Sequence, residues 1–355
     1  MGASTQAVAG ARVEAEDIVS ARPPRTVLLV LAFCFCYIAG ALALWPAIFL
    51  EMAQTYFLVL ALYGWMIALA IVLPLGVIAA PKQPVRAMID IIRRRGMLAV
   101  FVVATFALGL AAFTTYKLNI PTFVPFYGDK AMADIDDFLH GGPPWKIAHS
   151  VDSEITSWIV ARTYYGTWFF EWFGMAFLAA FHARQPLHQR YLVALALTTA
   201  VIGTFLATLF SSVGPIFYDQ LLNETRYADL YEALRHYPYN EHIVRHSEYL
   251  LQNYRAGSSE LGTGISAMPS MHVAIATLNA FYLARLNRWC GVVGWVFAVL
   301  ILFGSVYTGW HYALDGYVSV AVVSLIWWLS ASISERKSLV ISKGGSVTPA
   351  WTAAS

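Results

Sequence analysis

The hydrophobic and polar positions of this chain form long apolar runs separated by polar connections. A helix needs about 17–25 apolar residues to cross a bilayer. Eight runs near that length cover residues 26–50, 55–80, 97–116, 166–183, 191–213, 270–286, 290–308 and 311–332. Helices satisfy their own backbone hydrogen bonds in lipid. The pattern therefore predicts an all-α fold, a polytopic transmembrane helical bundle of about eight spans.

Two longer polar connections, at about 117–165 and 214–269, lie on the same side of the predicted bundle. The stretches "DKAMADIDDFLH", "RYADLYEALRHY" and "EHIVRHSEYLLQNY" within them space apolar residues at helical intervals. They predict outer amphipathic helices that lie on the membrane. We expect one membrane-embedded domain at 26–335, between cytoplasmic tails at 1–25 and 336–355.

Composition narrows the class of protein. The chain is 59% hydrophobic and only 12% charged, whereas soluble domains carry about 25% charged residues. Cys34, Cys36 and Cys290 all fall inside apolar runs, so they indicate neither a disulfide framework nor a zinc site. No cluster of carboxylates calls for a metal, and we expect neither metal nor cofactor. Two positions stay open for Glu171 in the fourth run: an intramembrane site that lines a cavity and, as the preferred one, the outer boundary in water.

The distribution of Lys and Arg predicts the orientation. The two termini and the even-numbered connections carry 15 Lys and Arg residues, and the opposite side carries eight, spread over longer loops rich in Asp and Glu. Short cytoplasmic connections are enriched in these cations. We therefore expect an integral membrane protein with both termini cytoplasmic. The two long connections then face the non-cytoplasmic side, either a periplasm or an organelle lumen.

Two short motifs carry candidate chemistry at that outer side. One is "PSMH", which includes Pro269, Ser270 and His272, and the other is "HYALD", which begins at His311. On the predicted topology each histidine opens a span at its outer end. Helix N-termini offer unpaired N–H groups and positive partial charge, which favour phosphate. Ser270 is suited to cap its helix or to bind a phosphate oxygen.

The spacing of these residues fits phosphoryl transfer. His311 and Asp315 are four residues apart, which places them on one face of a helix. A carboxylate there fixes the tautomer of the imidazole and leaves the other ring nitrogen free to attack as a nucleophile. His272 is then the candidate for proton transfer to the leaving group.

These residues resemble a known family. "GISAMPSMHVA" and "HYALD" are similar to the phosphatidic acid phosphatase type 2 (PAP2) superfamily, whose second motif is Pro-Ser-Gly-His and whose third contains His-x-x-x-Asp. Met271 in place of Gly, together with the aromatic-flanked His311, resembles the inositolphosphotransferase branch, which includes fungal inositol phosphorylceramide synthases. "GPIFYDQ" resembles the Pro-Pro-Trp-Tyr element of that branch through Pro215 and Tyr218.

The resemblance implies a fold and a reaction. The fold is a PAP2-like six-helix core with extra N-terminal spans. The reaction moves a phosphoryl group or phospho-headgroup from a phospholipid, sphingolipid or isoprenoid phosphate to an alcohol or to water. His311 would form a phosphohistidine, Asp315 would orient it, and His272 would protonate the leaving group. Ser270 would hold phosphoryl oxygens, with Pro215 and Tyr218 in the substrate site.

The cations of the family pattern are harder to locate. The first motif, Lys-x6-Arg-Pro, has no match, and the Arg expected six residues before the third-motif His falls at Ser305. A phosphoryl transition state spreads negative charge and requires fixed cations. Arg226 and Lys130, both in the outer connections, are the candidates to bind phosphate.

Three alternatives stay open at this stage. The first is a lipid or isoprenoid (di)phosphate phosphatase of the same superfamily, because transfer and hydrolysis share the first half-reaction. The second is a lipid transporter or flippase, which is expected to place ionisable groups at the bilayer midplane in paired repeats. The third is an inactive scaffold on the same fold. No feature indicates a nucleic-acid partner, and the sequence assigns no oligomeric state.

Overall fold

The computed structural model describes residues 25–183, 185–258, 260 and 262–331, and all regular structure within them is helical. The C-terminal tail and, apart from Arg25, the N-terminal tail that we predicted lie outside these residues. The helices are α2 (Arg25–Leu44), α3 (Pro46–Val59), α4 (Trp65–Ala79), α5 (Pro84–Phe123), α6 (Asp129–His140), α7 (Pro144–His149), α8 (Glu154–Val160), α9 (Trp168–Phe181), α10 (Pro186–Ala200), α11 (Ala207–Leu209), α12 (Pro215–Leu222), α13 (Ala228–Leu234), α14 (Glu241–Ala256), α15 (Met271–Leu286), α16 (Arg288–Tyr307) and α17 (Ala313–Leu329). Wider π-helical turns η1 (Leu60–Gly64), η2 (Ala161–Thr167) and η3 (Val201–Leu206) join α3 to α4, α8 to α9 and α10 to α11, and a short 3₁₀ turn, η4 (Pro238–Asn240), precedes α14.

Several helices have the length and composition of membrane spans. In the described part of the chain, four are long and apolar enough to cross a bilayer: Pro46–Ala79, Pro84–Phe123, Pro186–Leu209 and Arg288–Tyr307. Leu28–Leu44 and Ala313–Leu329 are shorter apolar helices. The remaining predicted runs correspond to α9 and α15, with 14 and 16 residues. The chain is thus a multi-pass membrane protein in which four of the eight predicted runs meet the length of a span.

Two helix boundaries differ from the hydrophobic pattern. The first apolar run was predicted to continue to residue 50, but α2 ends at Leu44 and α3 begins at Pro46. Proline has no N–H to donate and favours the first position of a helix, so it divides a continuous apolar stretch. Helix α5 has 40 residues, about 60 Å at 1.5 Å per residue. Its C-terminal end, at Phe123, lies past the predicted boundary at residue 116.

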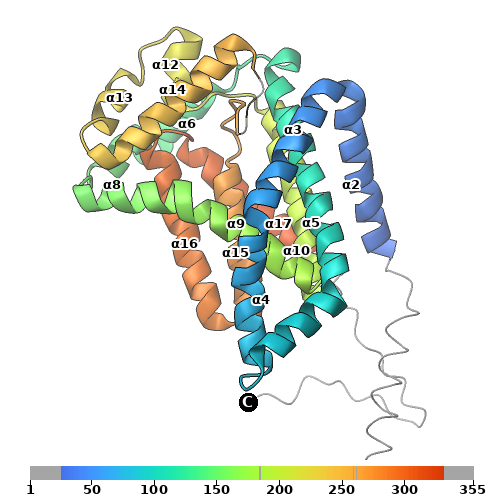
Figure 1. The fold of residues 1–355 in the computed structure, drawn as a ribbon. Helices are drawn as coiled ribbons and strands as arrows, with labels where there is room; N and C mark the ends of the chain where they lie inside the picture. The colour runs from blue at the N-terminus through green and yellow to red at the C-terminus, as the bar shows by residue number, and fades with distance from the viewer. Residues whose placement is uncertain (1–24, 184, 259, 261, 332–355) are drawn as a thin grey trace, which may run out of the picture.

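The predicted outer helices gather at one end of the bundle. Figure 1 shows α12, α13 and α14 together with α6 at the end where α3 begins. Helix α6 differs from the expected membrane-surface helix. Its buried residues are the carboxylates Asp129 and Asp136 together with Met132 and Ala133, while Phe138 is exposed. Backbone donors from other segments reach both carboxylates, as described below, and this contact turns the polar face of α6 inward.

Small residues bring α15 and α16 into close contact. A Cβ atom built on Gly291 would lie 2.7 Å from the Cα of Ala284, and one built on Gly294 would lie 2.9 Å from the Cα of Ala280. Small side chains at such an interface let two membrane helices approach closely and gain van der Waals contact. This hairpin holds the first turn of α15 and the last turn of α16 at the same end of the bundle.

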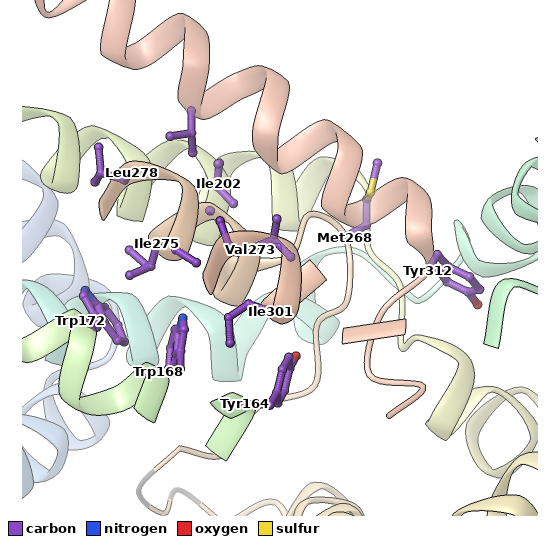
Figure 2. Close-up of a cluster of buried hydrophobic side chains, with 14 of the residues drawn as sticks. Tyr164, Trp168, Trp172, Ile202, Met268, Val273, Ile275, Leu278, Ile301 and Tyr312 are labelled. Atoms are coloured by element: carbon purple, nitrogen blue, oxygen red, sulfur yellow. The ribbon is translucent and has the colours of Figure 1, made fainter. Parts of the chain in front are cut away.

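Aromatic side chains of η2 and α9 form the wall that faces α15. Tyr164, Trp168 and Trp172 are buried, and Figure 2 shows them beside Val273 and Ile275 of α15. Large aromatic side chains bury about 150–250 Å² each, so they dominate the packing between these helices. The same wall continues to the first turn of α15, where His272 lies.

A polar network lies deeper between α9, α10 and α15. Glu171 is mostly buried, and its Oε2 accepts a hydrogen bond of 2.7 Å from Asn279 Nδ2. The Oδ1 atom of Asn279 accepts a second bond of 2.7 Å from the hydroxyl of buried Tyr191. The expectation that Glu171 lies in water was therefore wrong. The partner of Glu171 is the amide of Asn279 on α15, which lies more than 100 residues away in the sequence.

Gly214 is required where α12 approaches the turn before α17. Its φ is +85°, and a Cβ atom would lie 2.5 Å from the carbonyl oxygen of Trp310. We expect Gly214→Ala to lower the free energy of unfolding by about 2–4 kcal/mol, because it combines backbone strain with overpacking. Thermal unfolding in detergent would measure the change. The matched control is Gly174→Ala in α9, where a Cβ meets no atom within 4 Å. Equal melting temperatures for the two variants would contradict the prediction.

Candidate active site

His311 lies in the turn that enters α17. The structure places it just before Tyr312, the N-cap of that helix, and leaves it only 7% exposed. Its Nδ1 atom is 2.7 Å from the carbonyl oxygen of Ala267 and 3.5 Å from Oδ2 of Asp315. The spacing of four residues therefore does bring His311 and Asp315 together, with the closer contact made by a backbone carbonyl.

The Ala267 carbonyl determines which nitrogen of His311 carries the proton. A carbonyl oxygen can only accept, so Nδ1 must be the donor, and the neutral ring then keeps a lone pair on Nε2. Asp315 is fully buried, and its Oδ2 also accepts a bond of 2.9 Å from the backbone N–H of Tyr312. The carboxylate is thus held beside Nδ1, where it stabilises positive charge on the ring.

His272 lies in the first turn of α15, with its ring between two aromatic side chains. The ring centroid of Tyr164 is 4.3 Å away and that of Trp168 is 4.0 Å away. Trp168 also donates its indole N–H to the backbone oxygen of His272 at 3.0 Å. The centroids of the His272 and His311 rings are 6.1 Å apart. A phosphoryl group between the two rings is within reach of both.

Both histidines line a cavity of about 380 Å³. One part of its wall is polar and includes Lys117, His246, Thr263 and Ser266. The other part is apolar and comes from the spans, through side chains that include Tyr56, Val59, Leu110, Phe113, Trp172 and Phe173. The cavity is therefore amphipathic, with its ionisable groups gathered at one end. Within the described residues, no group of three or more His, Cys, Asp or Glu side chains is arranged to hold a metal ion.

Ser270 belongs to the framework of the site and does not line the cavity. It is completely buried, and its Oγ accepts from the N–H of Val273 as the N-cap of α15. Its backbone oxygen accepts a bond of 2.9 Å from the hydroxyl of Ser319 in α17. Of the two tasks expected for this hydroxyl, the observed contacts are those of helix capping.

The two cations expected to bind phosphate lie elsewhere. Arg226 forms ion pairs of 2.6 Å with Asp134 and 2.7 Å with Asp137, both on α6. Lys130 is exposed, and neither cation lines the cavity. The carboxylates of "DIDD" neutralise the charge of Arg226. These partners were not expected from the sequence.

Lys117 is a cation that lines the cavity and that was not among the residues expected from the sequence. It lies near the C-terminal end of α5 and lines the cavity together with both histidines. Its stem packs against Gly264, where a Cβ atom would be 3.2 Å from Lys117 Cγ and where φ is +100°. A signal was present in the sequence, because Lys117 is followed, after six residues, by Val124 and Pro125. The first family motif is therefore retained at Lys and Pro, with Val in place of Arg.

In the segment "GPIFYDQ", the residue that lines the cavity is Phe217, which lies between the predicted Pro215 and Tyr218. Pro215 and Tyr218 are buried, and the ring of Tyr218 packs 5.2 Å from that of Tyr227. Phe217, between them in the sequence, lines the cavity and packs 5.4 Å from the ring of Trp310. In the structure, Pro215 starts α12 and Tyr218 anchors it, while Phe217 faces the site.

Two buried carboxylates of α6 hold the loops around the site. Asp129 accepts from the N–H groups of Val213 and Gly214 and from the hydroxyl of Tyr312, all at 2.9–3.0 Å. Asp136 accepts from the N–H groups of Ala313 and Leu314. Burial raises the pKa of both carboxyl groups, and these hydrogen bonds oppose the rise. The N-terminus of α17 is therefore capped by Asp136. The sequence had indicated that this helix end would bind phosphate, but its N–H groups are already occupied.

We expect Asp136→Ala to lower the free energy of unfolding by about 2–4 kcal/mol. The substitution leaves two N–H groups of α17 without the charged acceptor that lies at 2.7 and 2.9 Å. Asp134→Ala is the matched control on the same helix, because its exposed ion pair contributes only about 0–1 kcal/mol. Melting temperatures in detergent compare the two variants. A larger loss for Asp134→Ala would overturn the assignment of Asp136 as the cap.

The fold and the cavity define a helical membrane protein with a histidine-lined pocket at one end of its bundle. A family model described as PAP2 superfamily matches residues 130–329, which is more than half of the chain. The chain therefore belongs to the PAP2 superfamily. Membership implies an enzyme of the phosphatase or phosphotransferase type and, in general, a lipid substrate that carries phosphate. No curated protein and no solved structure matched the chain.

The match confirms the resemblance at the level of the superfamily and extends it. The range 130–329 includes both histidines and Asp315, and it begins well before the segment that carried the resemblance in the sequence. It gives no support for the inositolphosphotransferase branch. Lys117 precedes the matched range, so its place in the site depends on the geometry alone.

Proposed function

We propose that this protein is a lipid phosphotransferase or phosphatase that acts through a phosphohistidine at His311. The observation that carries the proposal is the pair of imidazoles, 6.1 Å apart, at the polar end of an otherwise apolar cavity. A lipid fits such a cavity with its chain against the aromatic wall and its phosphate between the rings. Lys117 is the cation positioned to neutralise the phosphoryl oxygens.

The reaction proceeds in two displacements. Nε2 of His311 attacks phosphorus, the bond from phosphorus to the leaving oxygen breaks, and protonated His272 gives its proton to that oxygen. The N–P bond leaves positive charge on the imidazole, which Asp315 stabilises from the Nδ1 side. His272, now neutral, takes the proton of an alcohol or water, whose oxygen attacks phosphorus as the N–P bond breaks. His272 is protonated again at the end, and both half-reactions balance.

The cation content favours a phosphodiester donor. Of the three cations in the family pattern, two positions hold Val124 and Ser305, and the third is Lys117. A phosphodiester carries one negative charge, whereas a phosphate monoester carries up to two, so a single lysine suits the diester. Transfer of a phospho-headgroup, as in the inositolphosphotransferase branch, is therefore our preferred reaction, with hydrolysis of a lipid phosphate as the alternative.

We further propose that eight helices cross the membrane and that the site faces the non-cytoplasmic side. The bias of Lys and Arg toward the termini and even-numbered connections supports this orientation. The gathering of α6 and α12–α14 around one end of the bundle agrees with a large outer cap (Figure 1). Both termini are then cytoplasmic, at the end opposite to His311.

Purified protein in liposomes tests the function. The vesicles contain phosphatidate, an isoprenyl diphosphate or a phosphodiester lipid, with diacylglycerol or water as acceptor. Products are separated by mass spectrometry. Turnover of at least one phosphorus-bearing lipid, lost in His272→Ala, is the expected result. Movement of intact lipid between leaflets without any turnover would refute the enzyme reading and favour the transporter.

A further inference from the structure

A third imidazole lines the cavity beside the two of the reaction. His246 belongs to α14, an outer helix whose Glu241, Arg245 and Glu248 are exposed. Its ring stacks on that of Tyr249 at 5.9 Å, and the ring of Trp310, next to His311 in the sequence, is 5.5 Å away. The side chain is thus held at the polar end of the cavity by contacts to the faces and edges of aromatic rings.

The nitrogens of the His246 ring remain available to a ligand. Among the described residues, its contacts are to aromatic rings, and no side chain or backbone group is hydrogen-bonded to it. Burial, and secondarily the charge of Lys117, lower the pKa of His246, so the ring is neutral at pH 7. A neutral imidazole offers one N–H and one lone pair. It therefore suits a hydroxyl group better than a phosphate oxygen, which Lys117 already serves.

The surroundings of His246 differ from the lipid-facing end of the cavity. Thr263 and Ser266 line the same polar end, whereas the walls from α3, α5 and α9 are largely apolar. A lipid whose acyl or isoprenyl chain lies among the spans has its phosphate at the polar end of the cavity. Any polar groups attached on the far side of that phosphate then face α14. In the proposed first half-reaction His311 is the nucleophile, His272 is the acid and Lys117 is the cation, so His246 is left without a role in bond making or breaking.

We propose that His246 is a specificity residue that hydrogen-bonds a hydroxyl group of the substrate at the outer end of the cavity. The inference rests on the proposed function and extends it to the substrate class. The hydroxyl has two sources: a headgroup that stays on the transferred phosphate, or the acceptor that resolves the phosphohistidine. In either case, loss of the imidazole weakens discrimination for hydroxyl-bearing molecules and leaves phosphorus chemistry in place.

The test compares His246→Phe and His246→Gln with wild type, and with His242→Gln as a control for an exposed histidine of the same helix. Vesicles contain ³²P-labelled phosphatidylglycerol, which has headgroup hydroxyls, or phosphatidylcholine, which has none. Acid-labile label on the protein reports phosphohistidine formation. Its loss after water or glycerol is supplied reports the second half-reaction.

If the headgroup is the source, His246→Phe lowers kcat/KM for phosphatidylglycerol about tenfold and leaves phosphatidylcholine unchanged. If the acceptor is the source, labelling is unchanged and release slows about tenfold. His246→Gln restores part of either loss, because an amide also bonds hydroxyls. Equal losses of labelling with both lipids, or no change in either labelling or release, would overturn the inference. Absence of label on wild-type protein with both lipids, and also with labelled phosphatidate and isoprenyl diphosphate, would instead refute the proposed function.

Discussion

His311→Ala is expected to abolish the acid-labile phosphorylation of the protein and to lower turnover by about a thousandfold or more. The variant removes the nucleophile itself, and losses of this size are typical when a covalent catalyst is deleted. Asp315 and the Ala267 carbonyl, which hold the ring, are left without their partner. The measurement is single-turnover labelling with a ³²P-labelled lipid phosphate, followed by turnover in liposomes.

The control for this result is His242→Gln, an exposed histidine of α14 outside the cavity. It is expected to label and turn over like wild type. A melting temperature for each variant separates loss of chemistry from loss of fold. Label that persists at wild-type level in His311→Ala would show that another residue is the nucleophile, and the proposed mechanism would then be wrong.

Lys117→Met is expected to reduce kcat/KM by about 100- to 1,000-fold. Methionine is one atom shorter and keeps the unbranched stem that packs against Gly264, but it removes the positive charge from the cavity. Removing one fixed charge donor from a transition state usually has an effect of this size. Lys117→Arg keeps the charge and is expected to retain more activity than Lys117→Met. Steady-state kinetics with the same labelled lipid provide the comparison.

Lys82→Met is the matched control, because Lys82 is exposed in the turn between α4 and α5, away from the cavity. It is expected to leave kcat/KM within twofold of wild type. Full activity of Lys117→Met would show that Lys117 is not the phosphate-binding cation, and the loops that carry Lys130 and Arg226 would have to be tested instead. There, Arg226 is already paired with two carboxylates of α6.

Much of the fold followed from the hydrophobic pattern, because lipid leaves a helix as the only way for a single apolar segment to satisfy its backbone. The pattern was less informative about helix ends. It did not show that Pro46 divides the first apolar stretch or that α5 continues to Phe123. Its reading of α6 was incomplete, since a spacing argument cannot tell which face of a short helix meets water and which meets buried N–H groups.

The candidate site was predictable where chemistry is local. The "PSMH" and "HYALD" motifs located His272 and His311, which line one cavity, and Asp315, which lies buried beside His311. Residues whose roles depend on distant partners were missed or misplaced. Arg226 resembled a free cation until its ion pairs were seen, and Lys117 lies in an apolar helix more than 150 residues before His272.

By itself, the sequence determined that this protein is an all-helical membrane protein and which two motifs carry the paired imidazoles His272 and His311. Hydrophobic periodicity and residue type are local properties, so they can be recognised in the sequence without any knowledge of packing. Only the tertiary structure decided that the Ala267 carbonyl sets the tautomer of His311, that Asp136 caps α17, and that Lys117 and His246 share the cavity. Each of these depends on contacts between segments far apart along the chain, and hydrogen bonds and charges act over a few ångströms of space whatever the separation in sequence.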